Sequence, residues 1–142
     1  MSIIKDFLTS GSLGEMRLGM SISDVFSFLG QSEGVGKGLR GWTIESYSAG
    51  FLQIAHSKGV VGLIGIYFDP DKSSSSILPK AVNCEIQFSA QTTTAEFRKY
   101  LEDNVISYEF DTRLRDTTAL KIGVGVIASF EDDHLRSLLI SV

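Results

Sequence analysis

Residues 30–34, Gly-Gln-Ser-Glu-Gly, have types and spacing that could support nucleophilic chemistry. They match the G-x-S-x-G pattern, which places a serine, here Ser32, on a strained turn between a strand and a helix. The residues before Ser32 are predicted to be helical and those after it to form a loop, so the context is the wrong one. We therefore interpret the match as an accident of a glycine-rich segment.

Two further patterns concern phosphate and calcium. Residues 36–41, Gly-Lys-Gly-Leu-Arg-Gly, match G-x-G-x-x-G, whose glycines let backbone amides approach a pyrophosphate at a helix N-terminus. That motif needs a strand before it and a helix after it, and the predicted order is reversed. Asp69, Asp71 and Ser73 resemble the first ligands of a calcium loop, but Lys80 stands where the bidentate glutamate is required.

Cysteine and histidine are scarce: the chain has Cys84, His56 and His134. A single cysteine excludes an internal disulfide and a zinc site built from cysteines, and neither histidine has a second ligand at metal-binding spacing. Cys84 falls on the apolar face of an alternating segment, where a thiol is usually inert. We expect no metal and no cofactor, and an enzyme that depends on Cys84 or Ser32 is the third of three hypotheses.

Acidic residues in two predicted turns form the remaining candidate site. The chain carries 13 Lys and Arg against 17 Asp and Glu, a net charge of −4, and neither half is basic. Nucleic acid is therefore not an expected partner. Exposed acidic turns can oppose a basic cleft of another protein and speed its association. The candidate partner-binding residues are Asp69, Asp71, Glu131, Asp132 and Asp133.

The composition predicts a single domain over residues 1–142, since 43% of the residues are hydrophobic and 21% are charged. No run approaches the roughly 20 apolar residues of a membrane-spanning helix. The N-terminus resembles neither a signal peptide nor a lipoprotein leader. We expect a cytoplasmic protein without membrane association, and the composition leaves the oligomeric state open.

Three short helices are predicted to position these residues. The first covers residues 4–11, the second is capped by Ser21 and ends at Gly30, and the third is capped by Thr93, which forms a capping box with Glu96.

Strands are predicted where apolar residues alternate or form short unbroken runs. They are residues 42–47, 51–56, 60–68, 82–89, 106–110, 119–122, 124–130 and 135–142. Residues 31–41 are predicted to be a mobile loop, residues 131–133 the tip of a hairpin, and residues 82–88 an exposed edge. The expected class is α+β, with antiparallel sheet and two or three short helices. Residues 21–68 and 93–142 are candidates for two pseudo-repeated helix-plus-meander units.

Residues 17–30, RLGMSISDVFSFLG, carry a resemblance to a known family. They resemble the G-M-[ST]-x-x-x-V-x-x-x-L-G segment that opens the α+β domain of SmpA/OmlA/BamE outer-membrane lipoproteins and of small bacterial immunity-type proteins. The matching residues are Gly19, Met20, Ser21, Val25, Leu29 and Gly30. The resemblance implies a short helix docked on a sheet and, for the immunity-type members, a small acidic protein that binds a toxin.

Two main functional hypotheses follow. The first is a non-catalytic bacterial protein-binding protein, an immunity protein that neutralises a cognate toxin such as a nuclease through its acidic turns. The second is a small-ligand-binding or envelope-associated module of BamE-like fold, in which residues 31–41 act as a lid with Trp42 at its edge.

Overall fold

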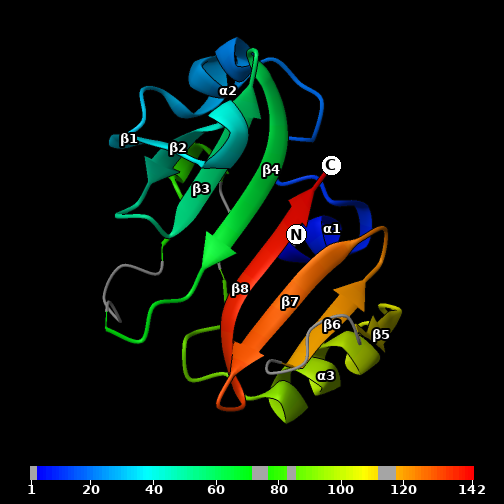
Figure 1. Cartoon of the computed structure of the whole chain (residues 1–142). Coiled ribbons are helices and arrows are strands. Elements are labelled where there is room, and N and C mark those ends of the chain that lie inside the picture. Colours follow the sequence, from blue (N-terminus) through cyan, green and yellow to red (C-terminus); the bar gives the residue numbers. More distant parts are fainter. Residues whose placement is uncertain (1–2, 72–76, 83–85, 112–117) are drawn as a thin grey trace.

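The computed structural model describes residues 3–71, 77–82, 86–111 and 118–142. In this part of the chain, eight antiparallel strands form one sheet with the order β1-β2-β3-β4-β8-β7-β6-β5 (Figure 1). The strands are β1 Gly34–Lys37, β2 Thr43–Tyr47, β3 Leu52–Ser57, β4 Val60–Tyr67, β5 Tyr108–Phe110, β6 Thr118–Ile122, β7 Val126–Glu131 and β8 His134–Ser141. Two meanders are thus joined where β4 pairs with β8.

Three α-helices accompany the sheet in the described residues: α1 Ile3–Ser10, α2 Ile22–Leu29 and α3 Thr94–Asp103. Two 3-10 turns, η1 Leu39–Gly41 and η2 Lys80–Val82, lie in the connections. The mixed α+β class and the three predicted helices are confirmed, although the sheet is the larger part of the fold. None of the described helices has the length and apolar character needed to cross a membrane.

Capping residues fix where two of the helices begin. The Ser21 hydroxyl accepts a hydrogen bond of 3.1 Å from the Ser23 N–H at the start of α2. Thr93 and Glu96 form both hydrogen bonds of a capping box at the start of α3. These bonds satisfy first-turn amides that have no partner within the helix.

All three helices pack on the same face of the sheet, which we call the helical face. Phe97 of α3 packs edge-on against Phe130 of β7 at 5.7 Å between ring centroids. Gly11, after α1, lies against Ile140 of β8, and the Tyr47 hydroxyl donates to the Gly30 carbonyl at the end of α2. The buried core lies between these helices and the sheet. The opposite face, which we call the open face, carries none of the described helices.

The structure of residues 31–41 differs from the prediction. They were expected to form a mobile loop but contain strand β1 and turn η1. Strand β1 pairs with β2 and forms one edge of the sheet, while β5 forms the other. Residues 82–88 were expected to form an exposed edge strand, but β1 and β5 form the two edges of the sheet.

The predicted strand at residues 82–89 is also wrong for the residues of that range that the structure describes. Val82 ends η2 and residues 86–89 have no regular secondary structure, while residues 83–85, including Cys84, lie outside the described residues. The Phe88 ring packs against Phe97 and Tyr100 at 4.8 and 4.9 Å between centroids. Because Val82 and Phe88 are buried in the core, the apolar character of these described residues reflects burial without strand pairing.

Two isolated bridges connect the helix starts to the middle of the sheet. Ser21, the N-cap of α2, bridges to Val60 at the start of β4. Thr93, the N-cap of α3, bridges to His134 at the start of β8. Each helix start is therefore held against a central strand.

Candidate functional site

The five predicted acidic residues lie at one end of the sheet, which we call the acidic end. Asp69 and Asp71 follow the last residue of β4, and residues 131–133 connect β7 to β8. Since β4 and β8 are antiparallel neighbours, the last residues of β4 and the first residues of β8 lie toward the same end of the sheet (Figure 1). All five side chains are exposed. The hairpin tip predicted at residues 131–133 is confirmed.

Backbone geometry shapes the two acidic turns. Asp69 Oδ1 accepts a 2.8 Å hydrogen bond from the Asp71 N–H, which closes an Asx turn. Asp132 and Asp133 have φ angles of 51° and 65°, a left-handed conformation that aspartate tolerates better than most residues. The Thr94 N–H donates to the Asp133 carbonyl at 3.2 Å. The second turn is thereby attached to the start of α3.

Glu96 is an acidic residue that the sequence analysis used only as a helix cap. Its hydrogen bonds with the backbone N–H and the side chain of Thr93 lower its pKa, and His134 lowers it further. Thr93 bridges to His134, and His134 lies opposite Glu131 in the β7–β8 register. Glu96 is therefore next to the acidic end and adds a carboxylate that is ionised at neutral pH.

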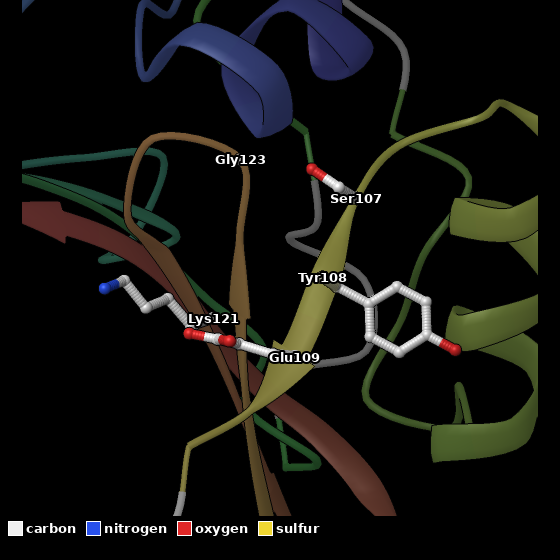
Figure 2. A pocket seen from close by; sticks show the side chains of 5 residues that line it. All are labelled: Ser107, Tyr108, Glu109, Lys121 and Gly123. Atoms are coloured by element: carbon white, nitrogen blue, oxygen red, sulfur yellow. The ribbon is translucent and has the colours of Figure 1, made fainter.

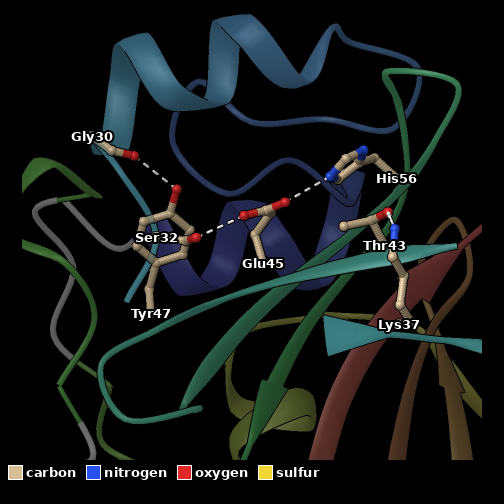
Figure 3. A network of polar contacts seen from close by, with 7 residues as sticks. All are labelled: Gly30, Ser32, Lys37, Thr43, Glu45, Tyr47 and His56. Atoms are coloured by element: carbon tan, nitrogen blue, oxygen red, sulfur yellow. Dashed lines mark hydrogen bonds and ion pairs between the residues drawn. The ribbon is translucent and has the colours of Figure 1, made fainter. Parts of the chain in front are cut away.

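A second cluster of polar side chains lies on the helical face near β1. Ser32 donates a 2.6 Å hydrogen bond to Glu45 Oε1, and His56 Nε2 lies 2.8 Å from Glu45 Oε2 (Figure 3). Glu45 is only 5% exposed. Burial by itself would raise the Glu45 pKa, but the bonds from His56 and Ser32 and the charges of His56 and Lys37 outweigh it and lower that pKa.

The order of contacts in this cluster does not match nucleophilic catalysis. A serine nucleophile requires a base, usually histidine, in hydrogen-bond contact with its hydroxyl. Here Glu45 lies between Ser32 and His56, and the Ser32 hydroxyl is used as a donor to the carboxylate. The cluster joins the segment after α2 to strands β2 and β3. The contact with Glu45 gives the half-buried His56 ring a hydrogen-bond partner within the fold.

Metal ligands do not gather in the described part of the chain. No group of three or more His, Cys, Asp or Glu side chains in these residues is arranged to hold a metal ion. Asp69 and Asp71, which resemble the start of a calcium loop, form the Asx turn described above.

Two surface pockets add further candidates. The first has a volume of about 290 Å³ and is lined by Ser107, Tyr108, Glu109, Lys121 and Gly123 (Figure 2). Glu109 and Lys121 are cross-strand neighbours there, and the Tyr108 ring points to the other side of β5 (Figure 2). The second pocket is apolar, has a volume of about 360 Å³ and is lined by Gly38, Leu39, Trp42, Ile44, Ala55, Gly62, Leu63, Ser141 and Val142.

Comparison of the chain with protein-family models, curated proteins and solved structures finds no match.

Proposed function

We propose that this chain is a non-catalytic protein-binding protein of the immunity type, which neutralises a toxin by covering a basic surface with its acidic end. The observation that supports this best is the placement of all five predicted acidic residues, with exposed side chains, at one end of the sheet. Glu96, next to the same turn, adds to the negative charge. The proposed partner has a basic cleft, as a nuclease has.

The electrostatics of this end suit fast association with a basic partner. Asp132 and Asp133 have no side-chain hydrogen bond or ion pair with another described residue, so a partner's cations would not have to displace an internal one. Clustered like charges raise the association rate of an oppositely charged protein, and this effect falls with ionic strength. Both turns are already ordered by a hydrogen bond, from the Asp71 N–H to Asp69 Oδ1 and from the Thr94 N–H to the Asp133 carbonyl, which reduces the entropic cost of binding.

The test is co-expression with a toxin candidate encoded beside this gene, with cell survival and toxin activity as readouts. The wild-type chain is expected to co-purify with the toxin and restore survival. The double variant Asp132→Asn/Asp133→Asn keeps the left-handed turn, because asparagine also tolerates it, and is expected to slow association about tenfold at low salt.

The matched control is Glu102→Gln/Asp103→Asn at the C-terminal end of α3, where two exposed acids are neutralised away from the acidic end. This variant is expected to protect as well as the wild type. Full toxin activity in the presence of the wild-type chain, or an equal loss in both double variants, would contradict the proposal for that toxin.

A second candidate function is small-ligand binding in the apolar pocket beside Trp42. It is favoured by the pocket's lining, which includes Leu39, Trp42, Ile44 and Leu63 and has a volume suited to a small apolar molecule. A thermal-shift screen with small metabolites, read out for the wild type and for Trp42→Ala, tests it. A shift seen only in the wild type would support it, and the absence of any shift would count against it.

We also propose that residues 21–68 and 93–142 are two pseudo-repeated units, each made of a helix and a meander of strands. It is supported by the sequence of elements, a capped helix followed by four strands in each unit, and by the two equivalent bridges, Ser21 to Val60 and Thr93 to His134. On this view a cytoplasmic immunity protein would present to its toxin the acidic end, where the last strands of the two units, β4 and β8, lie side by side.

A further inference from the structure

Strand β1 presents alternating glycines to the open face of the sheet. Gly34 and Gly36 are register partners of Ser46 and Ile44, which lie on that face, and the Gly38 N–H donates to the Trp42 carbonyl in the same register. Cross-strand neighbours project to the same side of a sheet. Glycines 34, 36 and 38 therefore form a bare strip of backbone next to Ile44 and Trp42, which we call the glycine strip.

The fold itself does not require these glycines. None of the three has a positive φ. A Cβ built on Gly34 or Gly36 meets no atom within 4 Å, and one on Gly38 makes only ordinary contacts at 3.4 Å or more. Glycine in a strand interior weakens the strand and often marks a place where a ligand or another backbone approaches closely.

Elsewhere on the open face, strand glycines are covered by aromatic rings. A Cβ on Gly62 would overlap the Trp42 ring, and one on Gly65 would lie 2.7 Å from Tyr67 Cε2. The Trp42 ring extends over Ala55 of β3 to reach Gly62. Gly62 has no register partner in β3, because Ala55 pairs with Leu63 and the next residue, His56, pairs with Val61. The glycine strip is the part of this face where strand glycines lack such a cover in the described structure.

Strand β1 also has hydrogen-bonding groups that point away from the sheet. In an antiparallel ladder, the residues that exchange hydrogen bonds alternate. Because Gly38 bonds to Trp42, the backbone groups of Gly36 and Gly34 also face β2. The N–H and C=O groups of Val35 and Lys37 then point outward from the edge of the sheet, where both residues are exposed.

We propose that β1 is a docking edge for an extended segment of a partner protein, which pairs with the outward groups of Val35 and Lys37 and lays an aromatic side chain across Gly36 toward Ile44 and Trp42. Edge-strand addition of this kind draws affinity from main-chain hydrogen bonds and specificity from alternate side chains. The residue of the segment opposite Lys37 is acidic, because it would project to the same side of the sheet as the exposed Lys37 ammonium group. This surface lies apart from the acidic end, so the inference goes beyond the proposed function and does not depend on it.

A second copy of the chain does not supply the required side chain. The residues that β1 of another copy would bring to the open face are again glycines. Strand β5, the other edge, would bring Glu109 to the open face. Glu109 pairs with Lys121, and Lys121 pairs with Ile127. Ile127 in turn is in register with Leu139 and Gly65, which belong to the open face. The aromatic cover must therefore come from a different protein.

The experiment is selection of random dodecapeptides displayed on phage against the immobilised full chain, followed by fluorescence polarisation with the selected peptides. We expect alternating sequences with an aromatic residue, and an acidic residue one or three positions away, because neighbours on one strand face opposite sides.

Val35→Pro removes only an outward N–H, which an edge strand tolerates, and is expected to weaken peptide binding at least about tenfold. Gly36→Val fills the strip and is expected to abolish binding while leaving the melting temperature unchanged or raised. Val35→Thr keeps the N–H and is the matched control with wild-type affinity.

Peptides that bind Val35→Pro and Gly36→Val as tightly as the wild type would overturn the proposal, as would selection without any binder or without aromatic enrichment. Sedimentation of the wild type as a dimer that Val35→Pro dissociates would assign the edge to a second copy and also overturn it. Loss of toxin protection in Asp132→Asn/Asp133→Asn with peptide binding intact would separate this edge from the proposed function.

Discussion

The indole ring of Trp42 lies over Gly62, two strands away on the open face, in the space that any side chain at position 62 would occupy. We predict that Gly62→Ala lowers the free energy of unfolding by about 1–3 kcal/mol, because the ring or the strand must move. Urea unfolding followed by the fluorescence of Trp42, the single tryptophan, measures this.

The control for that substitution is Gly36→Ala, which adds a methyl group in open space. It is expected to be neutral or slightly stabilising. In a double-mutant cycle followed by circular dichroism, because chains with Trp42→Ala have no tryptophan fluorescence, Trp42→Ala should remove most of the cost of Gly62→Ala. Equal costs of Gly62→Ala with and without the indole would contradict the contact.

The buried Glu45 carboxylate makes stability depend on pH. Its pKa in the folded protein is below the ordinary value of 4.5, so it stabilises the fold above that value and loses this contribution as the pH falls through the folded pKa. Glu45→Gln is expected to cost about 1.5–3 kcal/mol at pH 7, and the difference from wild type should shrink in acid.

Urea unfolding between pH 3 and pH 7 tests this expectation. The exposed Glu109→Gln is the control and should follow the wild-type curve. A constant difference between wild type and Glu45→Gln at all pH values would show that the carboxylate's charge is irrelevant.

The capping box of α3 gives a third prediction. Thr93→Ala removes the acceptor for the Glu96 N–H and is expected to cost about 1 kcal/mol. Thr93→Ser keeps a hydroxyl and should recover most of that loss. Thermal unfolding by circular dichroism compares the three chains, and an equal loss in both variants would point to the threonine methyl group as the cause.

The aromatic cluster between α3 and the sheet gives a fourth prediction. Phe97 is fully buried and contacts Phe88 and Phe130. Phe97→Ala should cost about 3–5 kcal/mol because it leaves a cavity. Phe110→Ala, at a ring that is 52% exposed, should cost much less. Denaturant midpoints of the two variants provide the test.

Local signals explain which elements could be predicted from the sequence. The starts of α2 and α3 follow from Ser21 and Thr93, since a capping hydroxyl acts on amides two or three residues away. Strands β2 to β4 and β6 to β8 follow from apolar periodicity, with ends within about two residues of those expected.

Strand β1 could not be predicted by the same rule. Gly34, Gly36 and Gly38 have no side chains to show a period of two, and an edge strand needs no buried residue. Val82 and Phe88 fit that period and are buried in the core, yet the described residues of their segment form no strand. Only tertiary packing distinguishes these two cases.

The polar cluster of Ser32, Glu45 and His56 could not be predicted from local sequence either. Ser32 and His56 lie 13 and 11 residues from Glu45, and they meet because the segment after α2 returns along β2. The sequence contained one signal: Glu45 is expected on the same face of its strand as the apolar ring of Tyr47, which is buried in the structure. A charged residue at such a position needs partners.

Strand β8 is the last of the described strands along the chain, yet it lies in the middle of the sheet between β4 and β7. During synthesis on a ribosome, the β8-facing edge of β4 therefore stays unpaired until residues 134–141 have emerged. An unpaired apolar edge is a template for aggregation. We expect nascent chains stalled before residue 134 to depend on chaperones, and release of the last strand to complete the sheet in one step.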